Sequence, residues 1–389
     1  MTNSLIIIMC VLVLLAYLFD LTASITKIPS VILLLILGFL VKLTTNLFHI
    51  NIPNLNPILP LLGTIGLILI VLEGSLDLEI NKQKLTLILK SFMVAFLPLI
   101  VLSFGIAYFL NFFFLIPFKV ALANTIPLSI ISSAIAIPSA RNLPQNQKEF
   151  VTYESSLSDI IGVIFFNFIT LNDHIGTKTF GYFTIEMLIM LIISFGATLL
   201  LSNYLNKIKH HIKFIPIIIS VVLIYTISKI YHLPGLIFIL IFGLFLGNIN
   251  QLRFIKFIQH YHPVIFFNDV IRFREITTEL AFLVRALFFI LFGFLIDFKD
   301  VFNTETIFLA FGITIFIFLL RYLILYFFKV STKSLTFIAP RGLITILLFL
   351  SIPAAQQTPF INNSLIIQVI LFTVIIMMVG MLKSHKTTP

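Results

Sequence analysis

The chain has 389 residues, of which 60% are hydrophobic and only 10% are charged. A soluble domain is charged at about a quarter of its positions, so the composition excludes a soluble globular protein. The apolar stretches have the ~17–25 residues that a helix needs to cross a bilayer, whereas β-barrel strands are segments of about ten alternating residues. The net charge of +10 is scattered over the loops, so no nucleic-acid partner is expected, and the single cysteine, Cys10, excludes a disulfide within the chain.

Hydrophobic segments follow one another along the whole sequence, and they predict an all-α polytopic membrane protein with about 13 transmembrane helices. The segments lie near residues 4–20, 28–47, 57–76, 85–110, 118–140, 155–171, 183–203, 212–231, 234–249, 277–297, 305–328, 334–354 and 362–382. The ninth segment is short enough to be re-entrant instead of spanning.

The distribution of Lys and Arg predicts the orientation, because cytoplasmic loops are enriched in these residues. With the N-terminus outside, the cytoplasmic loops carry Lys27, Lys82, Lys84, Arg141, Lys148, Lys207, Lys209, Lys213, Arg253, Lys256, Arg272, Arg274, Lys329, Lys333, Lys383 and Lys386. The opposite loops carry only Lys42, Lys119, Lys178, Lys229 and Lys299. We therefore expect a multi-pass protein of the cell inner (plasma) membrane with a cytoplasmic C-terminus.

Three pairs of segments resemble each other. The stretch "IPSVILLLILGFLVKL" (28–43) resembles "LPGLIFILIFGLFLGNI" (233–249), and 68–80 and 124–140 resemble 287–300 and 335–353. The two members of each pair are seven spans apart. Because successive spans alternate in direction and seven is odd, the second copy crosses the membrane in the opposite direction to the first. The pattern predicts two inverted six-helix repeats, about 4–171 and 212–382, joined by a linking helix at 183–203. We expect one transporter domain over residues 1–389, without a soluble regulatory domain, since inverted repeats are typical of secondary transporters.

Two matching segments contain residues that interrupt helices. Pro127 and Pro138 flank Ser132 and Ser133 in the fifth segment, and Pro340 lies in the twelfth. Proline removes a backbone donor and clashes with the carbonyl group one turn earlier. Interrupted helices in corresponding positions of two repeats indicate an ion-binding site, where freed carbonyl groups face the ion. Ordinary proline kinks are the alternative.

Asp159 begins a long uncharged run, and a carboxylate at the bilayer centre costs about 2.5–3.5 kcal/mol. It is therefore a candidate ion-binding residue, although a position near the membrane surface is the alternative. Ser155 lies one turn earlier on the same helix face, and Gly162 permits close approach of another segment. A carboxylate with hydroxyl oxygens suits an alkali cation and not a soft transition metal.

Arg321 and Arg341 also fall within or near spans, and Glu154 is a candidate partner for a buried arginine. The histidines lie in loops or at the edges of spans, and the sequence contains no Walker A motif and no nucleophile–base set. We therefore expect neither an enzyme nor an ATP-driven pump, and no cofactor.

Several of these motifs resemble the monovalent cation/proton antiporter superfamily, specifically its sodium/proton exchanger branch. "YESSLSDIIGV" (153–163) resembles the family stretch Glu-Ser-Leu-X-Asn-Asp, with Glu154 and Asp159 at the matching spacing. "FLLRYLILYF" (318–327) resembles the span whose arginine pairs with that glutamate, and "APRGLITILLFLS" (339–351) resembles the family's Leu-Arg-Gly segment. The sequence departs from the family at Ser158, where the family has Asn.

The resemblance implies crossed discontinuous helices, a core domain that slides against a dimer domain, and a homodimer. It also implies the roles of the site residues. The cation and the proton would bind at Asp159, Ser155, Ser158, Ser132 and Ser133; Glu154 and Arg321 would form a structural ion pair; Arg341, Pro127, Pro138 and Pro340 would support the broken helices. Residues 132–134 align with the family's Thr-Asp-Pro, so a second site carboxylate is absent.

The expected function is secondary antiport of Na⁺, K⁺ or Li⁺ against H⁺, with a role in pH homeostasis. With Asp159 as the one carboxylate of the site, exchange would be electroneutral and 1:1. Two other functions remain open at this point: a sodium-coupled solute symporter on the same scaffold, and a membrane sensor that does not transport.

Overall fold

The computed structural model describes residues 2–26, 28–49, 54–55, 57–80, 82–172, 176–208, 212–249, 251 and 263–385. Among the basic residues that predict the orientation, Lys27, Lys209, Arg253, Lys256 and Lys386 lie outside the described residues. The described part of the chain is helical and contains no β-strand, as the sequence predicts.

The helices follow the predicted segments closely. The first part contains α1 (Thr2–Thr26), α2 (Ser30–Leu47), α3 (Ile58–Asp77), the 3₁₀ turn η1 (Lys82–Lys84), α4 (Leu85–Phe114), α5 (Phe118–Ser129), α6 (Ser133–Ser139), α7 (Gln145–Leu171) and α8 (Thr177–Lys207). The second part contains α9 (Phe214–Ile230), α10 (Leu236–Gly247), α11 (Pro263–Leu295), α12 (Phe298–Val301), α13 (Thr304–Phe327), α14 (Thr332–Leu335), α15 (Leu343–Leu350), the 3₁₀ turn η3 (Ala354–Gln356) and α16 (Asn363–His385).

Within the described ranges, nine helical segments are long and apolar enough to cross a membrane, with α5 and α6 counted as one. Three shorter apolar helices correspond to α1, α9 and α10. The interrupted segment α14–α15 completes the set, which matches the predicted spans one by one. The fold is therefore that of a polytopic helical membrane protein.

Helices α7 and α11 begin ten or more residues earlier than the apolar segments predict. Their early turns carry charged residues that are paired in the structure: Glu149 of α7 lies 3.1 Å from Lys84, and Asp269 of α11 lies 2.5 Å from Lys213. A hydropathy pattern detects only the apolar part of such a helix. The predicted starts near 155 and 277 are wrong for this reason.

Equivalent helices of the two inverted repeats pack in equivalent ways. Helix α2 packs against α11, and its counterpart α10 packs against α3. Gly38 in α2 lies against the backbone of Phe294 in α11, where a Cβ atom would come within 2.8 Å of the amide nitrogen. The corresponding Gly243 in α10 lies against Ser75 and Leu76 in α3. Equivalent glycines thus allow equivalent close crossings, which supports the inverted six-helix repeats.

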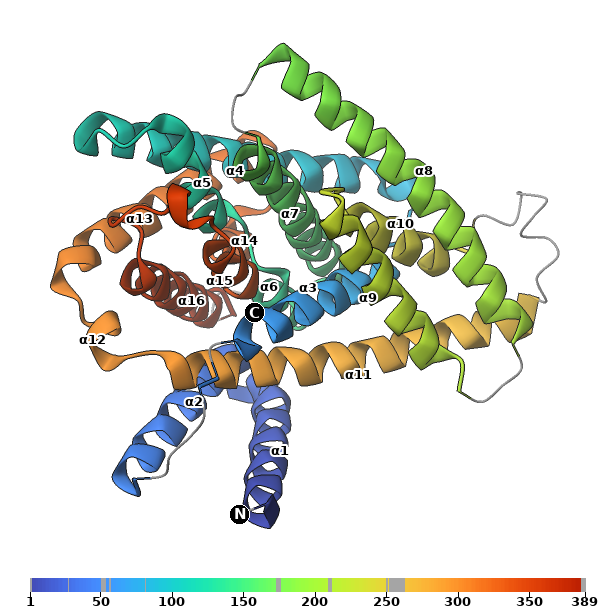
Figure 1. Cartoon of the computed structure of the whole chain (residues 1–389), viewed down its shortest axis with the longest axis horizontal. Coiled ribbons are helices and arrows are strands. Elements are labelled where there is room, and N and C mark those ends of the chain that lie inside the picture. Colours follow the sequence, from blue (N-terminus) through green and yellow to red (C-terminus); the bar gives the residue numbers. More distant parts are fainter. Residues whose placement is uncertain are drawn as a thin grey trace.

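Both predicted interruptions are present, and they cross each other. The chain is extended between α5 and α6 and again between α14 and α15. The backbone N–H of Ser132 in the first interruption donates to the carbonyl oxygen of Pro340 in the second, at 2.9 Å. The interrupted helices lie in the middle of the molecule, between α13 on one side and α9 and α10 on the other (Figure 1).

Candidate functional site

Asp159 lies in the middle of α7, and its side chain is only 2% exposed. Its Oδ2 accepts hydrogen bonds from the hydroxyl of Ser133 and, at 3.3 Å, from the backbone N–H of Ser133. Its Oδ1 is buried and has no hydrogen-bond partner among the described residues. An unpartnered buried carboxylate oxygen is costly, so this oxygen is available to a proton or a cation.

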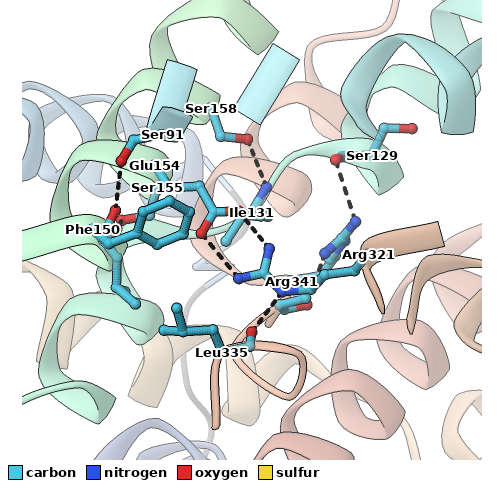
Figure 2. A network of polar contacts seen from close by, with 12 residues as sticks. Ser91, Ser129, Ile131, Phe150, Glu154, Ser155, Ser158, Arg321, Leu335 and Arg341 are labelled. Carbon is cyan, nitrogen blue, oxygen red and sulfur yellow. Dashed lines mark hydrogen bonds and ion pairs between the residues drawn. The ribbon is translucent and has the colours of Figure 1, made fainter. Parts of the chain in front are cut away.

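The neighbouring residues bring Asp159 against the interruption between α5 and α6. Gly162, less than one turn further along α7, lies in contact with the side chain of Ile130 in the interruption. The Oγ of Ser158 accepts a hydrogen bond from the backbone N–H of Ile131 at 3.0 Å (Figure 2). Ser158 therefore satisfies a backbone donor that the broken helix leaves without an intrahelical partner.

Of the four predicted serines, Ser133 is the one whose hydroxyl bonds to Asp159 within the described residues. The hydroxyl of Ser155 donates instead to the carbonyl oxygen of Val151 at 2.7 Å, one turn earlier in the same helix. This bond uses the hydroxyl proton and leaves the oxygen able to accept. Ser132 contributes its backbone to the contact with Pro340. The structure thus brings Ser132, Ser133 and Ser158 to one crossing, with Ser133 directly on the carboxylate, whereas Ser155 bonds within its own helix.

Glu154 and Arg321 form the ion pair that the family resemblance implies (Figure 2). The guanidinium donates to both carboxylate oxygens, at 2.5 and 2.9 Å, and its Nε donates to the carbonyl oxygen of Leu335 at 2.8 Å. The two side chains are 1% and 2% exposed. A bidentate, fully buried pair of this kind fixes geometry as well as charge, and here it joins α7, α13 and α14.

Arg341 forms no ion pair with a carboxylate among the described residues, and its guanidinium is surrounded by backbone carbonyl groups. It donates to Leu128 at 2.8 Å, to Ser129 at 3.3 Å and to Ala339 at 2.7 Å. Leu128 and Ser129 end α5, and a cation is favourable at the C-terminus of a helix. Arg341 therefore caps the first half-helix from the opposite interruption. The sequence indicated a buried arginine there and gave no signal for this target.

The three predicted prolines occupy different places around the crossing. Pro127 lies in the last turn of α5 and Pro138 lies near the end of α6, so they flank the interruption without forming it. Pro340 lies within the second interruption and accepts the hydrogen bond from Ser132. One freed backbone donor is thus paired across the two breaks, and the N–H groups of Ile131 and Arg341 donate to the hydroxyls of Ser158 and Thr373.

Two cavities lie near the site, one bordering α6 and the other bordering the second half of α7. We call them the inner and the outer cavity after the predicted orientation. The inner cavity, of about 60 Å³, is lined by Asp20, Ile28, Pro29, Ser30, Val31, Ala134, Ile135, Pro138, Ser139, Arg141, Asn142, Met377, Met378 and Met381. Across it, Asp20 of α1 accepts from Arg141 at 3.1 Å. This pair was not predicted from the sequence, because each residue lies at the end of its own segment.

The outer cavity, of about 410 Å³, is lined by Thr64, Leu67, Val163, Ile164, Phe166, Asn167, Thr170, Leu171, Tyr225, Lys229, His232, Leu233, Pro234, Gly235, Leu236, Leu347, Leu348, Ser351 and Pro353. Val163 lies one turn beyond Asp159 on α7, so this cavity begins about one turn of helix from the carboxylate. The inner cavity is lined by Ala134, the residue that follows Ser133.

Comparison with known proteins places this architecture in a family. The family model described as "Sodium/hydrogen exchanger, transmembrane" matches residues 10–384. A structure of the sodium proton antiporter MjNhaP1 from Methanocaldococcus jannaschii at pH 8 is similar, with a TM-score of 0.73, 20% identity and 99% of both chains covered. An electron-microscopy structure of the same antiporter gives a TM-score of 0.68 at 20% identity, covering 100% of this chain and 99% of the other.

No curated protein matches the chain. At 20% identity the two solved structures establish a shared fold. The family model covers nearly the whole chain, including both interruptions and the Asp159 region. The protein therefore belongs to the sodium/hydrogen exchanger family.

Proposed function

We propose that this protein is a secondary antiporter that exchanges a monovalent cation, Na⁺ or also K⁺ or Li⁺, for H⁺. The observation that carries the proposal is the carboxylate of Asp159, which is buried at the crossing of two interrupted helices with one oxygen unpartnered among the described residues. Intramembrane carboxylates in such positions mark ion pathways and proton relays. The family membership supports the same activity.

The coupling follows from competition for one carboxylate. When Asp159 carries a proton, it is neutral and holds no cation. When it is deprotonated, it binds a cation, whose shell is completed by hydroxyl oxygens of Ser133, Ser132, Ser155 and Ser158 and by carbonyl groups of the interruption. Hard oxygen ligands of this kind suit an alkali cation. One proton then exchanges for one monovalent cation, so transport is electroneutral.

Glu154 has a different role in this proposal. Its two oxygens are occupied by Arg321, so the carboxylate is not free to bind the transported cation. The pair instead holds α7 in register with α13 and α14, next to the segment that carries Asp159. Arg341 and the three prolines support the interruptions in the same way, by pairing or freeing backbone groups.

We further propose that the chain forms one transporter domain with repeats at about 4–171 and 212–382, joined by α8. It would lie in the plasma membrane as a homodimer, with the N-terminus outside and the C-terminus in the cytoplasm. Labelling tests the orientation: in a Cys10→Ala background, a membrane-impermeant maleimide should reach Lys383→Cys from the cytoplasmic side only. Light scattering of the purified protein tests the dimer.

Proteoliposomes with an internal pH-sensitive dye test the exchange. Addition of Na⁺, K⁺ or Li⁺ should dissipate an imposed pH gradient with the wild type, and Asp159→Asn should abolish the response for every cation. Ser156→Ala is the matched control, because Ser156 is buried in the same helix and faces Gly74 of α3. Full activity of Asp159→Asn refutes the site. A rate that follows an imposed membrane potential refutes the 1:1 stoichiometry.

A further inference from the structure

The outer cavity carries polar side chains that the exchange site does not use. Asn167 and Thr64 line it from α7 and α3. Asn167 lies two turns beyond Asp159 on the same helix face, at positions i and i+8 with Val163 between them. At a rise of 1.5 Å per residue, the two residues are about 12 Å apart along α7. Asn167 is therefore placed on the route between the cavity mouth and the carboxylate.

Neither side chain is used to hold the fold together. The amide of Asn167 and the hydroxyl of Thr64 make no hydrogen bond to any described residue. Other polar side chains of the region do: Thr170 donates to the carbonyl oxygen of Phe166 at 2.9 Å, and Asn172 donates to that of Phe168 at 2.9 Å. Polar groups that face a cavity without a protein partner are available to an ion or its water shell.

The size and charge of the cavity fit a hydrated cation better than a bare one. A volume of about 410 Å³ holds several waters, each of which takes about 30 Å³ in the liquid. The ligands that Asn167 and Thr64 offer are neutral oxygens, whereas the charged side chain of Lys229 and the imidazole of His232 lie at the exposed rim. A neutral site binds a cation weakly enough to release it, which passage through a pathway requires.

We propose that the carbonyl oxygen of the Asn167 side chain and the hydroxyl of Thr64 form an outer, transient binding site for a partly hydrated monovalent cation, through which the cation moves between the outer cavity and Asp159. The inference rests on the proposed exchange function. It adds a second site, which holds the cation on its way to Asp159. Lys229 repels a cation at the same mouth, so the site offsets this repulsion at the point where the cation begins to lose its water.

Kinetics with oriented vesicles test the site. Asn167→Ala and Thr64→Val should each raise the apparent KM for Na⁺ by roughly 3- to 10-fold, the loss expected for one polar contact, and leave the maximal rate within about twofold. The increase should occur for Na⁺ supplied on the side of the outer cavity and not on the opposite side. Asn167→Asp should lower the KM and also the maximal rate, because a charged site holds the cation longer.

Asn172→Ala is the matched control, since Asn172 is the same residue type at the end of the same helix and does not line the outer cavity. Its KM should equal that of the wild type. An unchanged KM for both Asn167→Ala and Thr64→Val, or an equal increase on both sides, overturns the outer site. That failure differs from failure of the exchange function, in which the wild type itself does not exchange or Asp159→Asn retains exchange. Asn167→Gln, which keeps the amide, shows whether lost activity reflects misfolding.

Discussion

At the scale of single residues, two carboxylates five positions apart in α7 have different environments. Asp159 accepts from one serine and has a free oxygen among the described contacts, while Glu154 is saturated by Arg321. The difference comes from what lies opposite each residue: an interruption of the chain faces Asp159, and an uninterrupted helix carrying an arginine faces Glu154. Sequence spacing alone does not distinguish these roles.

Removing one member of the Glu154–Arg321 pair leaves a buried charge without a partner, which typically costs about 3–5 kcal/mol. Glu154→Gln should therefore lower the midpoint of thermal unfolding of the purified protein markedly, as followed by circular dichroism. The double variant Glu154→Gln, Arg321→Met should recover much of the loss, because no unpaired charge remains. A double variant whose loss of stability equals the sum of the losses in the two single variants contradicts a coupled pair.

At the scale of helices, the crossings of α2 with α11 and of α10 with α3 depend on glycines, whose lack of a side chain allows the backbones to approach closely. Gly38→Ala would place a methyl group against the backbone of Ile290 and Phe294, and such overpacking costs about 1–3 kcal/mol. Thermal unfolding should shift downward accordingly. Gly196→Ala in α8 is the control, because no described atom lies within 4 Å of its Cβ position, and its stability should stay equal or rise by up to ~1 kcal/mol. Equal shifts in both variants contradict the close crossing.

The helices could be predicted from the sequence wherever the apolar segment and the helix have the same bounds. The apolar segments predict the spans, and Pro340 and the Pro127–Pro138 pair predict where two of them break. The starts of α7 and α11 were missed because charged residues in their early turns, which are paired in the structure, precede the apolar segments. The position of Asp159 was predictable from its isolation, whereas Asn167, the next polar residue on its face, was not singled out from the sequence. The targets of Arg341 depend on a crossing between residues more than 200 positions apart, which no local pattern encodes.

At the scale of the whole molecule, the inverted repeats place the two interruptions face to face and leave a cavity on each side. Asp20 and Arg141 pair across the inner cavity, and Asn167 and Thr64 line the outer one. In the proposed mechanism, Asp159 meets each cavity in turn, carrying a cation in one direction and a proton in the other. The central claim is that both ions compete for this carboxylate.

The pH dependence of the apparent KM for Na⁺ in proteoliposomes tests this claim most directly. If a proton and a cation compete for Asp159, the KM should rise about tenfold for each unit that the pH falls in the range where the site is protonated, because each unit changes the proton concentration tenfold. The maximal rate, measured at saturating Na⁺, should not change over the same range. A KM that is independent of pH, or a maximal rate that falls with pH while the KM stays constant, contradicts the account.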